Sequence, residues 1–393
     1  MNRLVQLSDV ALVFNGKTPA RVDQRQGGHP VLKIKDVNSL GRFAGSFESF
    51  VDHEFAARFS EKLVEVGDTL ILNAAHNADY VGSKSYLAEP SVVGSLPTGE
   101  WLVVRAMQHC TDARFIHHWI TSARIRQRLR DQVKGIHLYP KDVAALPVLL
   151  PSLHEQQRIA AILDKADSLR RKRLEAIRLA DEFLRAAYLD LATKHPDRAS
   201  VDSVLASIPN AARTGPFGSQ LLVSEFTESG IPVLGIDNVV SNSFTWGARR
   251  FVSPEKYKEL ERYTVRPGDV MVTIMGTTGR VAIAPEDLPV CISTKHLCTL
   301  SLDQQKMRPS YLWACLRWDP EVRAQTQRES KGAIMEGWNM GIVKGLMVSK
   351  PPMEAQLKFE ALLAKITQFS QNAGSAADQT DALVASLSAK YFS

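Results

Sequence analysis

Residues 154–192 read HEQQRIAAILDKADSLRRKRLEAIRLADEFLRAAYLDLA, and this stretch decides the architecture of the chain. It contains no proline and no glycine, and its apolar residues recur at steps of three and four, which predicts one long amphipathic helix. Pro151 and Pro196 bracket it as start and stop signals. A helix of roughly 39 residues is about 60 Å long. No globular core needs a helix of that length.

A second segment of the same kind closes the sequence. Residues 354–391 keep the apolar stripe, although it weakens at residues 372–375, where Gly374 costs about 1 kcal/mol relative to alanine. We expect a local defect or bend there. Two long helices with matching stripes are expected to pack on each other as an antiparallel pair. The alternatives are two unrelated surface helices, or helices that each pair with another chain.

The sequence before each helix is also duplicated, with a period near 200 residues. Similar segments follow one another in the same order, at offsets of about 200 to 202 residues. The matching segments are 30–34 with 232–236, 50–51 with 251–252, 65–70 with 266–271, and 146–156 with 346–356. A repeat of this length indicates a duplicated domain and not a solenoid.

Each copy combines a mixed domain with a long helix. Short β-branched runs bounded by glycine and proline predict strands, and segments such as 113–132 predict helices. The expected fold class is α+β, with two mixed α/β domains separated by a pair of long antiparallel helices that form a coiled coil. The predicted boundaries are 1–150 for the first domain, 151–196 for the central helix, 197–350 for the second domain and 351–393 for the C-terminal helix.

The composition is that of a globular protein and not of a membrane protein. Hydrophobic residues make up 45% and charged residues 23% of the 393 residues, as in globular proteins. The sequence lacks both an apolar run of the ~20 residues that a membrane span needs and the apolar segment of a signal peptide. We expect a soluble, cytoplasmic protein without membrane contact. The four cysteines form no Cys-x-x-Cys pair and are expected to be reduced thiols.

No motif in the sequence organises a reaction. The segment Asn15-Gly16-Lys17-Thr18 has Ala11 where a phosphate-binding loop requires glycine. His117 and His118 are adjacent and therefore cannot share a helix face as zinc ligands do. A Gly-x-Ser-x-Gly nucleophile elbow is also missing from the sequence. We expect no catalytic residue, no metal and no cofactor in this chain.

Two similar domains joined by long helices suit bivalent binding to a regular polymer such as double-stranded DNA. The net charge of +6 is mild, so the placement of basic and polar residues in loops matters more than the total. The DNA-binding candidates are Lys33, Lys35, Asn73, Asn77 and Lys84 in the first domain and Arg213, Thr277, Thr278, Arg280, Lys295 and Lys331 in the second. The partner-docking candidates, at or near helix ends, are Phe183, Leu184, Tyr188, Leu387 and Tyr391.

Residues 146–163, with the signature Pro-x-x-x-Glu-Gln, resemble the start of the central helix in the specificity subunits of type I restriction-modification systems. The second copy has Ala355 where glutamate is usual, and it retains Gln356. Further similar features are the segments 215–219 and 16–19 and the two Gly-Asp turns.

The resemblance covers the whole chain and implies a non-catalytic subunit. Its two target recognition domains would read a bipartite, asymmetric DNA sequence, and its helices would set the gap between the two parts. The helices would also dock two methyltransferase (modification) subunits that carry S-adenosylmethionine and methylate adenine. Restriction/translocase subunits would add ATP- and Mg-dependent translocation and cleavage. The alternatives are a coiled-coil protein-interaction scaffold without DNA specificity, and a methyltransferase with fused recognition domains.

Overall fold

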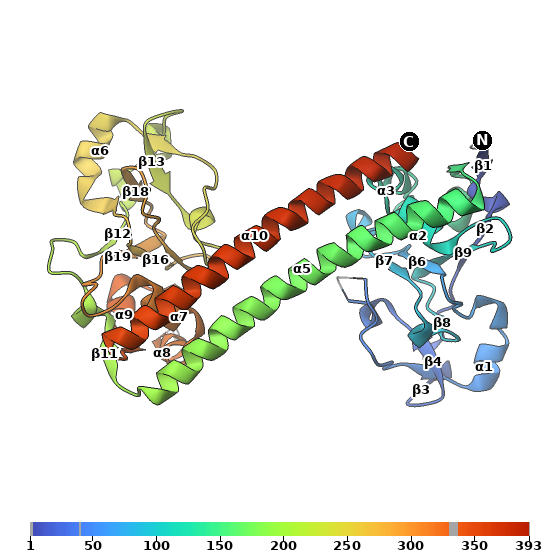
Figure 1. The fold of residues 1–393 in the computed structure, drawn as a ribbon, viewed down its shortest axis with the longest axis horizontal. Coiled ribbons are helices and arrows are strands. Elements are labelled where there is room, and N and C mark those ends of the chain that lie inside the picture. Colours follow the sequence, from blue (N-terminus) through green and yellow to red (C-terminus); the bar gives the residue numbers. More distant parts are fainter. Residues whose placement is uncertain (1–2, 39–40, 330–336, 393) are drawn as a thin grey trace. The chain divides into compact units, whose positions relative to one another are not determined.

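The computed structural model describes residues 3–38, 41–329 and 337–392, and the chain divides into two compact units (Figure 1). Unit 1 comprises residues 1–174 and 374–393, and unit 2 comprises residues 175–373. The long helices α5 (Leu153–Lys194) and α10 (Met353–Phe392) each contribute one part to each unit. The compact units therefore differ from the predicted boundaries, which placed both helices outside the mixed domains.

The helices pack antiparallel within each unit, as expected. In unit 1, Arg158 Nη2 lies 3.3 Å from Tyr391 Oη, and Arg170 forms an ion pair of 2.7 Å with Asp381. In unit 2, the rings of Tyr188 and Phe359 lie 6.3 Å apart. Residues later in α5 thus contact residues earlier in α10, which confirms the predicted direction of packing.

The helix α10 continues through residues 372–375, so a break in the helix, one form of the expected local defect or bend, is not present there. Packing offsets the low helix propensity of Gly374. Ala377 and Thr380 are buried, and the Arg173 guanidinium donates hydrogen bonds to the Ala376 carbonyl and the Thr380 hydroxyl. None of the helices that the structure describes is long and apolar enough to cross a membrane.

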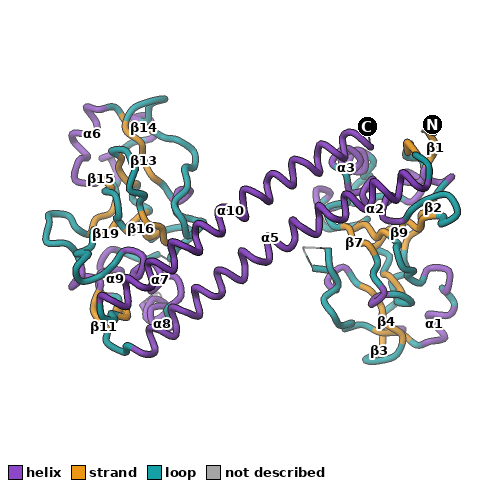
Figure 2. Tube along the Cα trace, viewed as in Figure 1, coloured by secondary structure: helices purple, strands orange, loops and turns teal. Residues whose placement is uncertain are grey.

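Unit 1 contains two four-stranded sheets and short helices, joined by long loops (Figure 2). The first sheet is antiparallel and has the order β2 (Ala11–Asn15), β9 (Trp101–Ala106), β6 (Thr69–Leu72), β7 (Ser85–Leu87). The second has the order β3 (Gln24–Arg25), β5 (Phe50–Val51), β4 (His29–Leu32), β8 (Leu96–Pro97), with β4 and β8 parallel. β1 (Arg3–Gln6) pairs with β10 (Pro147–Leu150), and the short helices are α1 (His53–Ala57), α2 (Ala113–Thr121), α3 (Ala123–Asp131) and α4 (Pro140–Ala144).

Unit 2 repeats the first sheet and three strands of the second, which agrees with the duplication. Its first sheet has the order β12 (Ala212–Thr214), β19 (Leu297–Leu300), β16 (Val270–Thr273), β17 (Val281–Ile283). Its second has the order β14 (Phe251–Val252), β13 (Ile231–Leu234), β18 (Cys291–Ser293), β15 (Thr264–Val265), with β13 and β18 parallel. The edge strand of the second sheet differs: β3 pairs with β5 in unit 1, whereas β15 pairs with β18 in unit 2. β11 (Arg198–Ser200) pairs with β20 (Met347–Ser349), and the helices are α6 (Pro254–Leu260), α7 (Pro309–Trp318), α8 (Pro320–Glu329) and α9 (Met340–Gly345).

The main core of each unit includes residues from both long helices. In unit 1, Ile159 and Leu163 of α5 pack with Phe115 of α2 and Phe392 at the end of α10. The rings of Phe115 and Phe392 lie 5.5 Å apart. The last residues of the chain therefore complete the core of the same unit that contains its first strand (Figure 1).

One buried glutamine fastens the start of each long helix to its domain. In unit 1, Gln156 Oε1 accepts a hydrogen bond from the Asp112 N–H at the start of α2 (2.9 Å), and Gln156 Nε2 donates to the Cys110 and Pro151 carbonyls. In unit 2, Gln356 repeats all three bonds with Arg308, Lys306 and Pro351. The clamp does not involve the preceding position, where Glu155 forms an ion pair with Arg158, so the second copy keeps its clamp with Ala355 in that place.

We predict that Gln156→Leu lowers the free energy of unfolding of unit 1 by about 3 kcal/mol, because it leaves the three clamp partners without their bonds. Urea unfolding followed by circular dichroism measures the loss. Glu155→Ala, which copies the residue of the second repeat, is the control and should change stability little. Equal effects of the two substitutions would contradict the clamp.

Candidate nucleic-acid interface

Three segments of unit 1 meet where β6 ends. Asn73, the residue after β6, donates its backbone N–H to the Glu100 carbonyl (2.9 Å) and accepts a bond from the Leu138 N–H (2.8 Å). The turn at residues 98–100 joins β8 of the second sheet to β9 of the first. We define residues 73, 98–100 and 137–139 as the unit 1 junction.

Unit 2 has the same arrangement after β16. Ile274 donates its N–H to the His296 carbonyl (2.9 Å) and accepts from the Trp338 N–H (2.8 Å). Residues 274, 294–296 and 337–339 are the unit 2 junction. The start of each turn is held alike, because the N–H groups of Thr98 and Thr294 bond to the last carbonyl of β4 and β13, respectively. Glu100 of unit 1 therefore corresponds to His296 of unit 2.

A glycine lies against each turn. A Cβ atom at Gly16 would lie 2.2 Å from the Pro97 carbonyl oxygen, and one at Gly215 would lie 2.0 Å from the Ser293 carbonyl oxygen. No other residue fits at such distances. This close approach explains why glycine stands at residues 16 and 215, in the two segments, 16–19 and 215–219, that resemble the family.

Two adjoining hollows open beside the unit 1 junction. One, of about 360 Å³, is lined by Asn73, His137 and Tyr139, and the other, of about 230 Å³, is lined by Lys33. Thr18 and Glu100 line both. The sequence reasoning missed Glu100, Thr18, His137 and Tyr139, because segments so far apart in the chain share no local pattern.

The structure sorts the unit 1 candidates into two groups. Lys33 lines a hollow, while Lys35 (paired with Glu48) and Asn77 are exposed. Asn73 is buried, and its side-chain amide donates to Asn15 Oδ1 (2.8 Å) and to the Gly99 carbonyl (3.1 Å). The Lys84 ammonium donates to the carbonyls of Ile34 and Val37. The polar groups of Asn73 and Lys84 are thus engaged in holding the fold, which argues against direct DNA contacts by these two residues.

In unit 2, Arg213 also holds the fold, which argues against a direct DNA contact by this residue. It is buried and forms an ion pair with the equally buried Asp269 of the Gly-Asp turn. Thr277, Arg280 and Lys295 are exposed, and Thr278 is partly buried. Lys331 lies outside the described residues. Unit 2 therefore offers Thr277, Arg280 and Lys295 as the exposed members of the predicted set.

The partner-docking candidates also divide. Leu184 and Tyr188 are buried in the core of unit 2, where the Tyr188 hydroxyl donates to Asp319 Oδ2 (2.8 Å). They cannot form a docking surface, since they lie on the face of α5 that packs into the core of unit 2. Leu387 and Tyr391 pack at the edge of the unit 1 core and are partly buried. Phe183 is 54% exposed and remains available.

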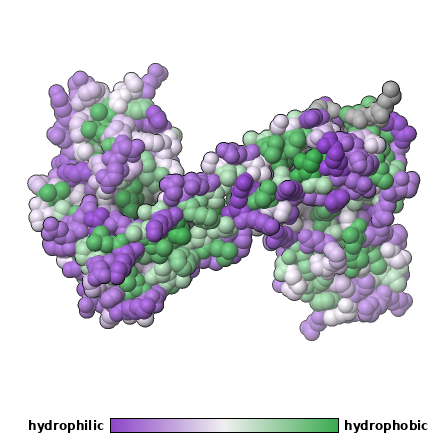
Figure 3. All heavy atoms as spheres, in the orientation of Figure 1, coloured by the Kyte–Doolittle hydropathy of each residue, from purple (hydrophilic) through white to green (hydrophobic). Residues whose placement is uncertain are grey.

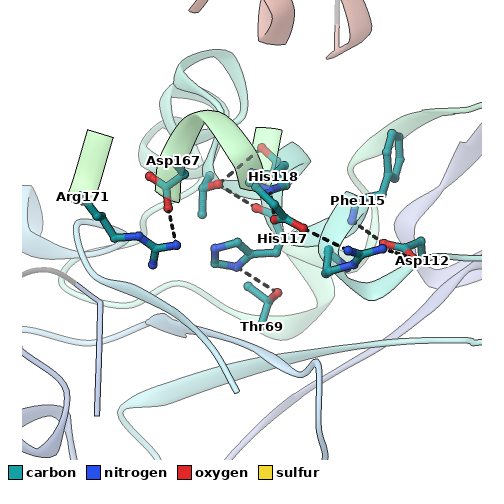
Figure 4. A network of polar contacts seen from close by, with 10 residues as sticks. Thr69, Asp112, Phe115, His117, His118, Asp167 and Arg171 are labelled. Carbon is teal, nitrogen blue, oxygen red and sulfur yellow. Dashed lines mark hydrogen bonds and ion pairs between the residues drawn. The ribbon is translucent and has the colours of Figure 1, made fainter. Parts of the chain in front are cut away.

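A polar network joins α2 to α5 in unit 1 (Figure 4). His118 Nε2 lies 2.7 Å from Asp164 Oδ1, Arg114 donates to the other oxygen of Asp164 (3.1 Å), and His117 Nδ1 lies 3.3 Å from the Thr69 hydroxyl. Burial, the largest effect, together with the positive charges of His118, Arg126 and Arg171, lowers the pKa of His117 to about 3. The negative charge of Asp164 acts in the opposite direction and raises it. His117 is therefore neutral in the folded protein at neutral pH.

This depressed pKa makes unit 1 less stable in mild acid. Below pH 6.5 the unfolded chain binds a proton at His117 that the folded chain does not bind, so stability falls with pH down to about 3. The contribution is about 2 kcal/mol between pH 7 and pH 5. We predict that His117→Gln flattens the pH dependence of urea unfolding by this amount, whereas His154→Gln, on an exposed position of α5, does not. Equal slopes for both variants would contradict the prediction.

The sequence is similar to proteins of one kind. Residues 2–179 match the family described as the type I restriction modification DNA specificity domain. The chain is 25% identical to the type I restriction enzyme EcoBI specificity subunit of Escherichia coli, over 99% of this chain and 85% of that protein. It is 22% identical to the MjaVIII specificity subunit of Methanocaldococcus jannaschii, over 69% of this chain and 63% of that protein.

Solved structures share the fold. The S subunit of a type I restriction-modification system from M. genitalium superposes with a TM-score of 0.62 at 10% identity, covering 100% of this chain and 96% of that chain. A chain from a study of complex assembly and conformational transition of the type I R-M system gives a TM-score of 0.53 at 18% identity, covering 100% and 97%.

Proposed function

We propose that this chain is a specificity subunit of a type I restriction-modification system, a non-catalytic DNA-recognition subunit, and that its two units read the two parts of a bipartite, asymmetric DNA target. The family match over residues 2–179, the similar specificity subunits and the shared fold support the assignment. The observation that carries the proposal is the duplicated junction. Both units hold it with the same backbone bonds, and the accessible side chains at its turns differ: Glu100 in unit 1 corresponds to His296 in unit 2. A common framework with different side chains suits two unlike half-sites.

We also propose that the outer faces of α5 and α10 dock two modification subunits, which carry S-adenosylmethionine and methylate adenine. Large apolar side chains remain exposed on the helix pair after it has packed on itself; in unit 2 they gather over the helices (Figure 3). They are Leu179, Phe183, Leu357 and Phe369 in unit 2 and Leu169, Leu174 and Leu383 in unit 1. Restriction/translocase subunits that use ATP and Mg would join the same complex.

Methylation mapping tests the proposed function. The chain is expressed with the adenine methyltransferase of its own system, and N6-methyladenine is located across the genome. We expect one bipartite motif with a fixed gap. A coiled-coil scaffold without DNA specificity would produce no motif that depends on this chain. Binding of the complex to a duplex carrying the motif should weaken as salt rises, since phosphate contacts release counterions.

A further inference from the structure

We propose that the turns at residues 98–100 and 294–296 contact base edges, with Glu100 accepting a hydrogen bond from a cytosine amino group and Lys295 donating to O6 and N7 of a guanine. The inference rests on the proposed function, since it assigns one base in each of the two half-sites. It follows from the place of the turns in the fold, from their rigidity and from the charge that each one presents.

Each turn is held in place before any ligand arrives. Gly99 donates its N–H to the Thr18 hydroxyl (2.9 Å), and Gly16 packs directly against the preceding carbonyls. The carbonyl of the last turn residue bonds to Asn73 in unit 1 and to Ile274 in unit 2. A preformed turn loses little conformational entropy when its side chains bind a base, so its contacts can discriminate strongly.

Glu100 places an exposed carboxylate at the unit 1 junction. A carboxylate near DNA is repelled by phosphates, whereas it is the preferred acceptor for the amino group at N4 of cytosine. The Thr98 hydroxyl donates to Glu100 Oε2 (3.1 Å), which orients the carboxylate beside the two hollows. Lys33 lines one of these hollows and supplies the positive charge that a neighbouring phosphate needs.

The unit 2 turn presents the opposite charge. Lys295 is exposed, and burial together with Lys295 and Arg250 lowers the pKa of His296, which is therefore neutral at neutral pH. The Arg250 guanidinium is already paired with Asp237. The ammonium of Lys295 is thus the charged, exposed donor that the turn offers, and guanine, with acceptors at O6 and N7, is the base that lysine recognises.

The test is methylation mapping with two single variants, Glu100→Gln and Lys295→Met, in the full chain together with its methyltransferase. Glu100→Gln should relax the preference for cytosine at one position of one half-site, and the glutamine amide favours adenine in its place. Lys295→Met should relax the preference for guanine at one position of the other half-site. We expect the selectivity at each position to fall roughly tenfold or more, with all other letters kept.

Matched controls are Glu89→Gln and Lys258→Met, which neutralise exposed charges outside the junctions and should leave the motif unchanged. Glu100→Asp keeps the acceptor and should keep the cytosine. An unchanged motif in both test variants overturns the inference, as does uniformly weaker methylation with the same motif, which would identify phosphate contacts. A variant that fails to fold, judged by its thermal unfolding curve, would make the turn structural and overturn it too. A wild-type complex without any motif would instead refute the proposed function.

Discussion

Replacing Arg213 with methionine is expected to lower the free energy of unfolding of unit 2 by about 3–5 kcal/mol. Arg213 and Asp269 are each only 3% exposed, and the substitution leaves the carboxylate buried without its counter-charge. The guanidinium also donates to the carbonyls of Thr264 (2.7 Å) and Asn210 (3.0 Å), so backbone acceptors lose partners as well. Urea unfolding of the full chain, with tryptophan fluorescence as the probe, measures the loss.

Two controls separate this structural role from DNA binding. Arg280→Met removes an exposed arginine of the same unit and should leave the unfolding transition in place. Adding Asp269→Leu to Arg213→Met removes the stranded charge and should recover part of the lost stability. If Arg213→Met kept its full stability and lost only DNA affinity, Arg213 would belong to the interface after all.

A DNA target with a longer gap is the expected result of inserting one turn of four residues into both helices, near Ala176 and Ala376. Both helices are continuous through these positions, so each becomes about 6 Å longer. DNA advances ~3.4 Å per base pair, so we expect a gap longer by one or two base pairs and both half-sites unchanged. The fit is imperfect because four residues exceed a 3.6-residue turn by about 40°.

The insertion has to be made in both helices because their contacts depend on register. Arg170 pairs with Asp381, and Arg173 bonds to the Ala376 carbonyl and to Thr380. An insertion in α5 alone shifts these partners by a full turn and should abolish methylation of any target. Methylation mapping compares the single and double insertions. Half-sites that change while the gap stays constant would show that the helices do not set the spacing.

The duplication predicted most of the sheet topology of unit 2 from that of unit 1, but it did not predict the edge strands of the second sheets or the partners of equivalent residues. Asp68 and Asp269 occupy the same place in the two Gly-Asp turns and both are buried. Asp68 pairs with Arg105 of β9, whereas Asp269 pairs with Arg213 of β12. The two repeats thus satisfy the same buried carboxylate from different strands, which no comparison of the repeats reveals.

The sequence by itself determined the features that depend on local periodicity and self-similarity. The steps of three and four in residues 154–192 specify a helix wherever it packs, and the offset of about 200 residues specifies two copies of one domain. The paired glutamines Gln156 and Gln356 belong to the same class, since their hydrogen-bond partners repeat with them.

Only the tertiary structure decided which polar residues face inward and which segments meet. The sequence alone does not distinguish an exposed basic residue, such as Lys295, from one that is buried against a carboxylate, such as Arg213. Asn73, Glu100 and Leu138 meet through backbone bonds between distant segments, and Phe392 completes a core begun by the first strands. Such contacts form when chain segments far apart in sequence bury apolar surface together, and that long-range burial leaves no short pattern in the sequence.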